Sequence, residues 1–231
     1  MWWIGHSWAL FLARLPVFSA CGAWFGRIIF VERHLCGKVG VGTDHKAETA
    51  GDVMQGNGTE QTDAQSGLVI YALQVGGGTL AISPLPGITG HYAADVELIG
   101  SWRPGLVISM TTDVEMFQFG ARTFGADIQS RASRWAHLPV DDFGAPTPEI
   151  DEQWPEVSRS ARQALAGGGR VLIHCRGGCG RSGMVALRLM VECGEKGPDA
   201  VARLRGVRPC AVETDAQMDW ALAGRKQRTA K

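Results

Sequence analysis

The sequence predicts an α/β fold in which helices flank a mostly parallel central sheet. From residue 67 onward, strand-like and helix-like segments alternate along the chain, which is the order of a parallel sheet with crossover helices. Residues 106–110 and 171–173 are continuous apolar runs, as expected of strands that are buried on both faces.

Turn and cap residues set the bounds of the expected elements. The glycines at 76–78 predict the turn of a hairpin, and Pro104 with Gly105 ends a helical pattern. A second run of glycines, at 167–169, ends a long helix. We therefore expect strands at 68–73, 79–83, 106–110, 135–140 and 170–174, and helices at 91–102, 113–125, 148–166, 181–193, 198–205 and 213–223.

Residues 1–66 are expected to form an extension ahead of a catalytic domain at 67–231. The extension begins with an apolar, Trp-rich stretch that Arg14 and Pro16 interrupt. A membrane-spanning helix is poorly compatible with a central charge and with such a break, so we expect no membrane attachment. Residues 37–67 are rich in Gly, Thr, Asp and Gln, which is typical of a linker or a disordered segment. A wrongly assigned translation start is the other interpretation of this extension.

Composition argues against nucleic acid and acidic membranes as partners. The chain has 231 residues, of which 23 Lys and Arg balance 23 Asp and Glu, so no net charge attracts it to either. Its 6 cysteines do not form the compact framework of a small secreted protein. This favours a reducing compartment, the cytoplasm, with Cys193 and Cys210 as packing residues.

The segment at 171–183 carries the chemistry. A buried strand leads into a glycine-rich loop, and an amphipathic helix starts directly after it. Glycines let successive N–H groups converge on one point and form a nest for an anion, and the start of the helix adds its own N–H groups. Arg181 can fork onto two phosphate oxygens. The expected phosphate-binding residues are Arg176, Gly177, Gly178, Cys179, Gly180 and Arg181.

Cys175 stands at the mouth of this loop, where the positive field favours the thiolate. A thiolate is a nucleophile without a dedicated base, and Ser182 can donate a hydrogen bond to the sulfur when it leaves. Hydrolysis of a phosphate ester also needs an acid that protonates the departing oxygen. Asp141 and Asp142 are the two candidates, because they lie in a loop rich in Gly and Pro.

The run at 174–182 resembles the C-x5-R-S signature of the protein tyrosine phosphatase superfamily. Residues 137–146 look like the general-acid loop of the dual-specificity-like branch, and residues 80–87 look like an early strand and turn of the cyclin-dependent-kinase-associated phosphatase group. The likeness covers roughly residues 68–224. It implies a phosphotyrosine-phosphatase-like fold and a two-step hydrolysis through a phosphocysteine, with no metal and no organic cofactor.

The resemblance also assigns roles residue by residue. On the acid-loop pattern, Asp142 matches the acid and Asp141 a variable position. Residues 212–217 are similar to a late motif of the superfamily whose glutamines position the hydrolytic water. Gln217 matches the second glutamine, whereas Glu213 occupies the place of the first. The implied catalytic residues are Cys175, Arg181, Asp142 and Ser182.

Other functions remain open at this point. A rhodanese-like sulfurtransferase also carries a cysteine on a loop between strand and helix, but the five residues between Cys175 and Arg181 and the candidate acid favour a phosphatase. A non-catalytic phosphate-binding module would typically have lost the cysteine, the arginine or the acid. A redox-active thiol protein is the third reading, in which Cys179 traps an oxidised Cys175 as a disulfide.

The expected substrate is a phosphorylated protein, of the dual-specificity or tyrosine type. A deep phosphotyrosine pocket usually draws on a Tyr-bearing recognition loop, and neither Tyr71 nor Tyr92 lies in such a motif. Arg176 adds one positive charge to the loop, where phosphoinositide phosphatases tend to have lysines. A small phosphomonoester is the alternative substrate.

Overall fold

The computed structural model describes residues 28–30 and 67–224, and its sheet confirms the predicted α/β class. Strand order across the sheet is β1-β2-β3-β6-β4-β5. Neighbouring strands run parallel except for β2 and β3, which are antiparallel. The strands are β1 (Ile28–Phe30), β2 (Ile70–Val75), β3 (Gly78–Ser83), β4 (Leu106–Ser109), β5 (Arg134–His137) and β6 (Arg170–His174).

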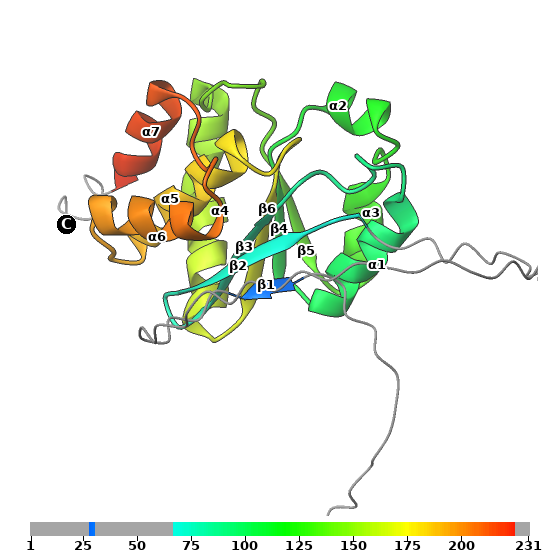
Figure 1. Cartoon of the computed structure of the whole chain (residues 1–231), viewed down its shortest axis with the longest axis horizontal. Coiled ribbons are helices and arrows are strands. Elements are labelled where there is room, and N and C mark those ends of the chain that lie inside the picture. Colours follow the sequence, from blue (N-terminus) through cyan, green and yellow to red (C-terminus); the bar gives the residue numbers. More distant parts are fainter. Residues whose placement is uncertain (1–27, 31–66, 225–231) are drawn as a thin grey trace, which may run out of the picture.

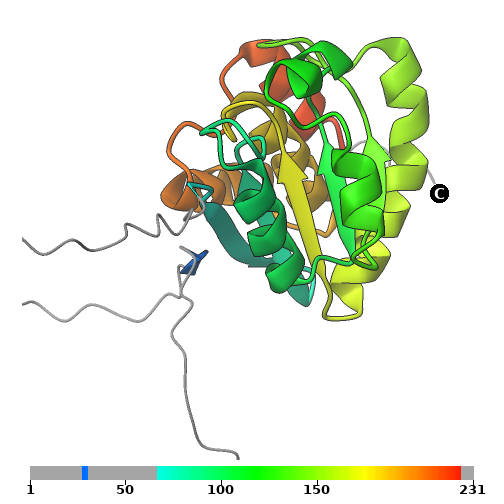
Figure 2. The same cartoon turned by 90° about the vertical axis from the view of Figure 1, so that its right-hand side faces the viewer.

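Helices cover both faces of this sheet (Figure 1, Figure 2). They are α1 (Tyr92–Trp102), α2 (Asp113–Gln118), α3 (Phe124–Gln129), α4 (Pro148–Ala166), α5 (Gly180–Glu192), α6 (Gly197–Val207) and α7 (Asp215–Leu222). The first three helices pack on one face and the last four on the other, and each face has its own hydrophobic cluster. Along β6, Val171 and Ile173 enter one cluster and Leu172 the other. This confirms the prediction of a strand buried on both faces.

Two of the predicted elements differ in the structure. The helix expected at 113–125 is instead the pair α2 and α3, because Gly120 takes a left-handed conformation with φ 69° and turns the chain between them. The strand expected at 135–140 ends at His137. Beyond it, Leu138 N–H and Val140 N–H still donate to carbonyl groups at the end of β4 and just after it. An extended segment therefore continues towards the loop that contains Asp141 and Asp142.

Three residues of the predicted N-terminal extension join the sheet, since β1 pairs in parallel with β2. The Trp-rich apolar stretch, apart from these residues, and the linker expected at 37–66 lie outside the described residues. In the described part of the chain, no helix has the length and apolar character needed to cross a membrane.

A buried ionic network holds α5 between α4 and α7. One carboxylate oxygen of Glu192 accepts from Trp154 Nε1 at 3.0 Å and from Arg188 Nε at 2.7 Å. The other oxygen accepts from the Ser158 hydroxyl. Arg188 donates further to the Trp220 carbonyl oxygen. Because the glycine-rich loop leads directly into α5, this network fixes the helix on which the loop ends.

Removal of the carboxylate from this network tests its contribution. In Glu192→Ala the buried Arg188 guanidinium loses its ion partner, so we expect the free energy of unfolding to fall by about 3–5 kcal/mol in urea denaturation. Glu156→Ala is the control, because it removes an exposed carboxylate that pairs with Arg159. This second change should alter stability by less than about 0.5 kcal/mol. Equal losses in the two variants would contradict the role given to the network.

Candidate active site

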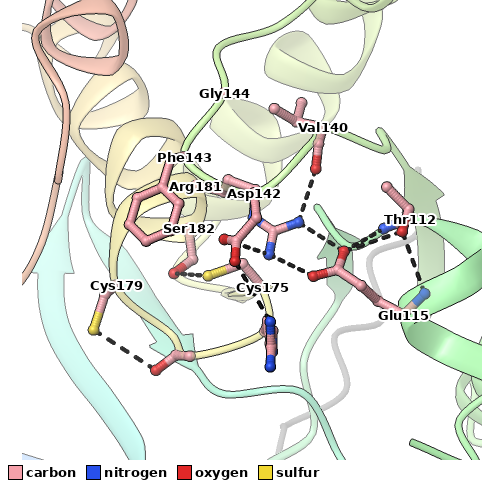
Figure 3. Close-up of polar contacts among 12 residues, drawn as sticks. Thr112, Glu115, Val140, Asp142, Phe143, Gly144, Cys175, Cys179, Arg181 and Ser182 are labelled. Atoms are coloured by element: carbon pink, nitrogen blue, oxygen red, sulfur yellow. Dashed lines mark hydrogen bonds and ion pairs between the residues drawn. The ribbon is translucent and has the colours of Figure 1, made fainter. Parts of the chain in front are cut away.

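The loop between β6 and α5 lies at the carboxyl end of the sheet. Because β4, β5 and β6 are neighbouring parallel strands, the segments that follow them meet at the same edge. Cys175 follows β6, Glu115 lies in the helix after β4, and Asp142 lies in the loop after β5. Figure 3 shows these side chains converging around the guanidinium of Arg181. The structure thus brings together four side chains from three connections.

Gly178 lets the predicted phosphate-binding loop, residues 175–181, pass close to the end of β3. Its φ is 67°, a conformation that favours glycine. A Cβ atom there would lie 2.6 Å from the Ser83 carbonyl carbon and 2.7 Å from Pro84 N. On the same side, Leu85 N–H donates to the Arg176 carbonyl oxygen at 3.1 Å. The loop therefore follows a path that a larger residue at 178 would block.

Cys175 and Ser182 face each other across the loop. The Cys175 Sγ atom lies 3.3 Å from Ser182 Oγ, and the cysteine side chain is buried, at 3% exposure. Ser182 belongs to the first turn of α5 and is fully buried. This is the geometry in which the hydroxyl can donate a hydrogen bond to a thiolate.

Arg181 is buried, with 1% exposure, and its guanidinium is held from several sides. Nη1 donates to Glu115 Oε2 and to the Val140 carbonyl oxygen, both at 2.8 Å. Nη2 donates to Glu115 Oε1 at 2.7 Å and to Asp142 Oδ1 at 3.1 Å. Nε is buried and has no hydrogen-bond partner among the described residues. An anion in the loop can satisfy this donor.

Glu115 anchors Arg181, and the sequence reasoning missed it. Its carboxylate accepts hydrogen bonds from both Nη atoms of Arg181, and it also accepts from Thr112 N–H at 2.9 Å. Burial alone would raise the pKa of Glu115, but the hydrogen bonds from Arg181 and Thr112 outweigh it, so that the pKa lies below its usual value. A signal was present, because Thr112 and Glu115 form a capping box at the start of α2. That pattern indicates a helix start and does not reveal a distant arginine.

The structure separates the two candidate acids. Asp142 turns towards the site, with Oδ1 on Arg181 and Oδ2 3.6 Å from Arg176 Nη1. Both aspartates are exposed, and the Asp141 carbonyl oxygen accepts from Gly144 N–H in the turn of the loop. Arg176 also lies over the Phe119 ring, at 5.6 Å from its centroid. Asp142 is therefore the carboxylate at the mouth of the phosphate-binding loop.

Gln217 and Glu213 reach the site from the start of α7. The Gln217 side chain is fully buried, its Nε2 donates to the Gly144 carbonyl oxygen at 3.0 Å, and its Oε1 accepts from Glu213 N–H at 3.0 Å. Thr214 Oγ1 donates to the Phe143 carbonyl oxygen at 3.3 Å. The start of α7 thus holds the loop that contains Asp142 at two carbonyl groups. The Glu213 carboxylate instead lies against Gly180, where it would overlap a side chain.

The prediction that Cys210 is only a packing residue was wrong. Cys179 forms a disulfide with Cys210, which the sequence analysis treated as a packing residue. Cys175 is not part of a disulfide. The physical reason is the turn of the chain after α6, which brings residue 210 to the outer side of the loop, with a Cα–Cα distance to Cys179 of 5.3 Å.

His174 lies under the loop in its neutral form. Ser109 Oγ accepts from Trp135 Nε1 at 2.8 Å, and it lies 2.6 Å from His174 Nε2. The serine hydroxyl thus bonds the indole and the imidazole at the same time, while His174 Nδ1 is buried and has no hydrogen-bond partner among the described residues. Burial, together with the charges of His137 and Arg181, lowers the pKa of His174 to about 3. The imidazole is therefore a packing and hydrogen-bonding group next to Cys175.

A cysteine at the end of a central parallel strand, followed through a glycine loop by a buried arginine, is the arrangement of the cysteine-dependent phosphatases. Residues 106–230 match the family model described as "Swiss Army Knife protein, DSP-PTPase phosphatase domain". This match covers more than half of the chain. The chain belongs to this family of dual-specificity-type phosphatase domains, and it is a cysteine-based phosphatase. The family implies phosphorylated substrates.

Solved structures share the fold. Kinase-associated phosphatase, with its catalytic cysteine replaced by serine, is 22% identical, and the match covers 70% of this chain and 97% of that one with a TM-score of 0.60. The active form of Tk-PTP is 29% identical over 64% of this chain and 92% of that one, with a TM-score of 0.52. A structure of PTPMT1 in complex with PI(5)P is 17% identical over 69% and 97%, with a TM-score of 0.55.

The buried imidazole predicts a specific pH dependence of stability. Between the unfolded pKa of about 6.5 and the folded value, the unfolded chain binds a proton at His174 that the folded protein does not. Stability should therefore fall, as the pH is lowered below about 6.5, by about 1.4 kcal/mol per pH unit from this group. In urea unfolding, the loss from pH 7 to pH 5 should be about 2 kcal/mol smaller in His174→Asn than in the wild type. Parallel pH profiles of the two proteins would show that the imidazole titrates normally.

Proposed function

We propose that this phosphatase hydrolyses phosphomonoesters of phosphoproteins, of the dual-specificity or tyrosine type, through a phosphocysteine. The observation that carries the proposal is the convergence of Arg181 and Asp142 on the loop that holds Cys175, with Ser182 Oγ 3.3 Å from the sulfur. The candidate nucleophile and the anion-binding cation come from the connection after β6, and the candidate acid comes from the connection after β5. Their proximity supports one joint chemical role.

In the first step, the Cys175 thiolate attacks phosphorus while the loop N–H groups and Arg181 hold the equatorial oxygens. The S–P bond forms as the ester P–O bond breaks, and Asp142 transfers its proton to the departing oxygen. In the second step, water attacks phosphorus and gives a proton to the Asp142 carboxylate. The S–P bond breaks, phosphate leaves, and Ser182 stabilises the returning thiolate by a hydrogen bond.

For the water-positioning residues we propose a division of labour. Glu213 retains the role expected from the late motif, since its carboxylate lies against Gly180 of the loop. Gln217 has both ends of its amide engaged, with Gly144 and with Glu213 N–H. We therefore assign Gln217 a different role, which is to hold the loop that contains Asp142 in place over the phosphate-binding loop.

A phosphoprotein is the preferred substrate class, and a small phosphomonoester is the alternative. PTPMT1, which shares the fold, has a structure in complex with PI(5)P, so a phosphorylated lipid headgroup is among the small substrates to be assayed. The cytoplasm is the proposed compartment, as the cysteine usage of the sequence favours. There, the Cys179–Cys210 disulfide would meet thiol reductants.

Hydrolysis of an aryl phosphate by the purified protein in EDTA tests the reaction. We expect metal-independent turnover that Cys175→Ser abolishes and that Asp142→Asn lowers at least about tenfold, because the acid step is lost. Asp141→Asn is the matched control and should remain within about twofold of the wild type, since a surface side chain contributes little. Equal effects of the two Asn variants would reject Asp142 as the acid. Turnover of thiosulfate and cyanide, without turnover of the ester, would point to a sulfurtransferase.

The role of Gln217 is tested by the dependence of the rate on the leaving group. If Gln217 holds the acid loop, Gln217→Ala should slow hydrolysis of an alkyl phosphate about tenfold and hydrolysis of p-nitrophenyl phosphate much less, because a good leaving group needs little proton transfer. A water-positioning role predicts the opposite, namely accumulation of phosphocysteine detectable by mass spectrometry after rapid acid quench. That accumulation would overturn the assignment.

A further inference from the structure

The outer side of the phosphate-binding loop is held by a short segment between α6 and α7 that the sequence reasoning did not connect with the site. This segment, residues 208–210, contacts the loop in two different ways. Arg208 donates to the carbonyl oxygens of Gly178 and Gly177, at 3.0 and 2.9 Å. Cys210 is bonded to Cys179. We call residues 208–210 the clasp.

Arg208 acts on the side of the loop that faces away from the anion. In a nest, the N–H groups converge on the ligand, and the carbonyl groups therefore point outward. Here two consecutive outward carbonyls, of Gly177 and Gly178, accept from one guanidinium. A positive donor on these oxygens polarises the same peptide groups whose N–H ends bind the anion. The contact therefore favours the anion-binding orientation of both peptides.

Arg208 is itself held in place. Nη1 donates to the Tyr71 hydroxyl at 2.9 Å, and the guanidinium lies over the Tyr71 ring at 4.5 Å from its centroid. Tyr71 belongs to β2, on the far side of β3 from the loop strand. Arg208 therefore connects the sheet to the loop and restricts the conformational freedom that the glycines of the loop would otherwise allow.

The disulfide adds a covalent link to the same loop. It joins Cys179, the residue before α5, to Cys210 across 31 residues of sequence. Cys210 is exposed and Cys179 is half-buried, so a reductant in solution can reach the bond. This covalent link between loop and clasp is thus present in the oxidised protein and absent in the reduced one.

We propose that the clasp positions the phosphate-binding loop, through Arg208 and through a disulfide that makes phosphate affinity depend on the thiol redox state. Reduction needs a thiol reductant. A dithiol attacks the bond, the S–S bond breaks, Cys179 and Cys210 each end as a thiol, and the reductant closes to its own disulfide after giving two electrons and two protons. This inference rests on the proposed phosphate-binding role of the loop.

Inorganic phosphate is the probe, because its binding can be measured by titration calorimetry without any turnover. The full chain is purified in air, and peptide mapping establishes the Cys179–Cys210 bond. After treatment with dithiothreitol and removal of the reductant under nitrogen, we expect the dissociation constant of phosphate to rise about 3–10-fold. Cys210→Ser should show the raised value with or without reductant. Cys193→Ser, which alters a cysteine outside the disulfide, should behave as the wild type.

The arginine is tested separately. Arg208→Gln should raise the dissociation constant of phosphate about tenfold, and Arg208→Lys should recover part of the loss, because an ammonium can reach one carbonyl but not two. Arg203→Gln is the control, since Arg203 donates to the Gln74 carbonyl oxygen away from the loop. Each variant is titrated well below its melting temperature, so that the constant reports the folded protein.

Two results would overturn the proposal. Free thiols at 179 and 210 in the air-purified protein would remove the covalent link, and an unchanged phosphate affinity after proven reduction and in Arg208→Gln would remove the positioning role. If the protein turns over no phosphomonoester, yet its phosphate affinity still depends on the disulfide and on Arg208, the proposed catalysis fails and the clasp stands.

Discussion

The buried ion pair between Arg181 and Glu115 is the interaction on which the rest of the site depends. A guanidinium at 1% exposure is tolerated only when its charge and its N–H groups are matched. Glu115 supplies both, with two hydrogen bonds of 2.7 and 2.8 Å. Because Glu115 follows β4 and Arg181 follows β6, the pair also joins the segments that follow two neighbouring strands. Arg181 also donates to the carbonyl oxygen of Val140, which follows β5. One side chain therefore contacts the segments that follow β4 and β5, and itself belongs to the segment that follows β6.

The same arginine serves two anions that compete for it. Asp142 contacts Nη2 in the described structure, and a phosphate group in the loop would approach the same guanidinium. In the proposed mechanism, substrate binding must therefore loosen the hold of Arg181 on Asp142, whose carboxyl group then has to reach the leaving oxygen. Arg176 gives Asp142 a second, half-exposed partner at 3.6 Å, which can keep the carboxylate at the mouth of the loop. Glu115 binds both Nη atoms of Arg181, so it would hold the guanidinium in position during such an exchange.

The parts of the site that are contiguous in the chain could be predicted from the sequence, whereas those assembled from distant segments could not. The strand, the glycine loop, Cys175 and Arg181 follow one another within a dozen residues, so their order already implies the anion nest. Glu115 lies 66 residues from Arg181, and its local pattern describes only a helix cap. The partner of Cys179 is 31 residues away, and no spacing rule selects one of the other five cysteines for it. Tertiary packing alone decides these contacts.

The two cysteines of the loop, Cys175 and Cys179, need opposite redox states for the roles proposed for them. Cys175 has to remain a reactive thiol, and a second thiol four residues away in a flexible glycine loop is the partner that could capture it after oxidation. The bond to Cys210 occupies Cys179 and so removes that partner while the loop is oxidised. In this proposal, Cys179 could form a disulfide with Cys175 when it is a free thiol, and it holds the loop in place when it is bonded to Cys210. The glycines allow the loop to adopt the nest conformation, but they also allow it to leave that conformation. Its shape must therefore be fixed by neighbours such as Glu115, Arg208 and the disulfide.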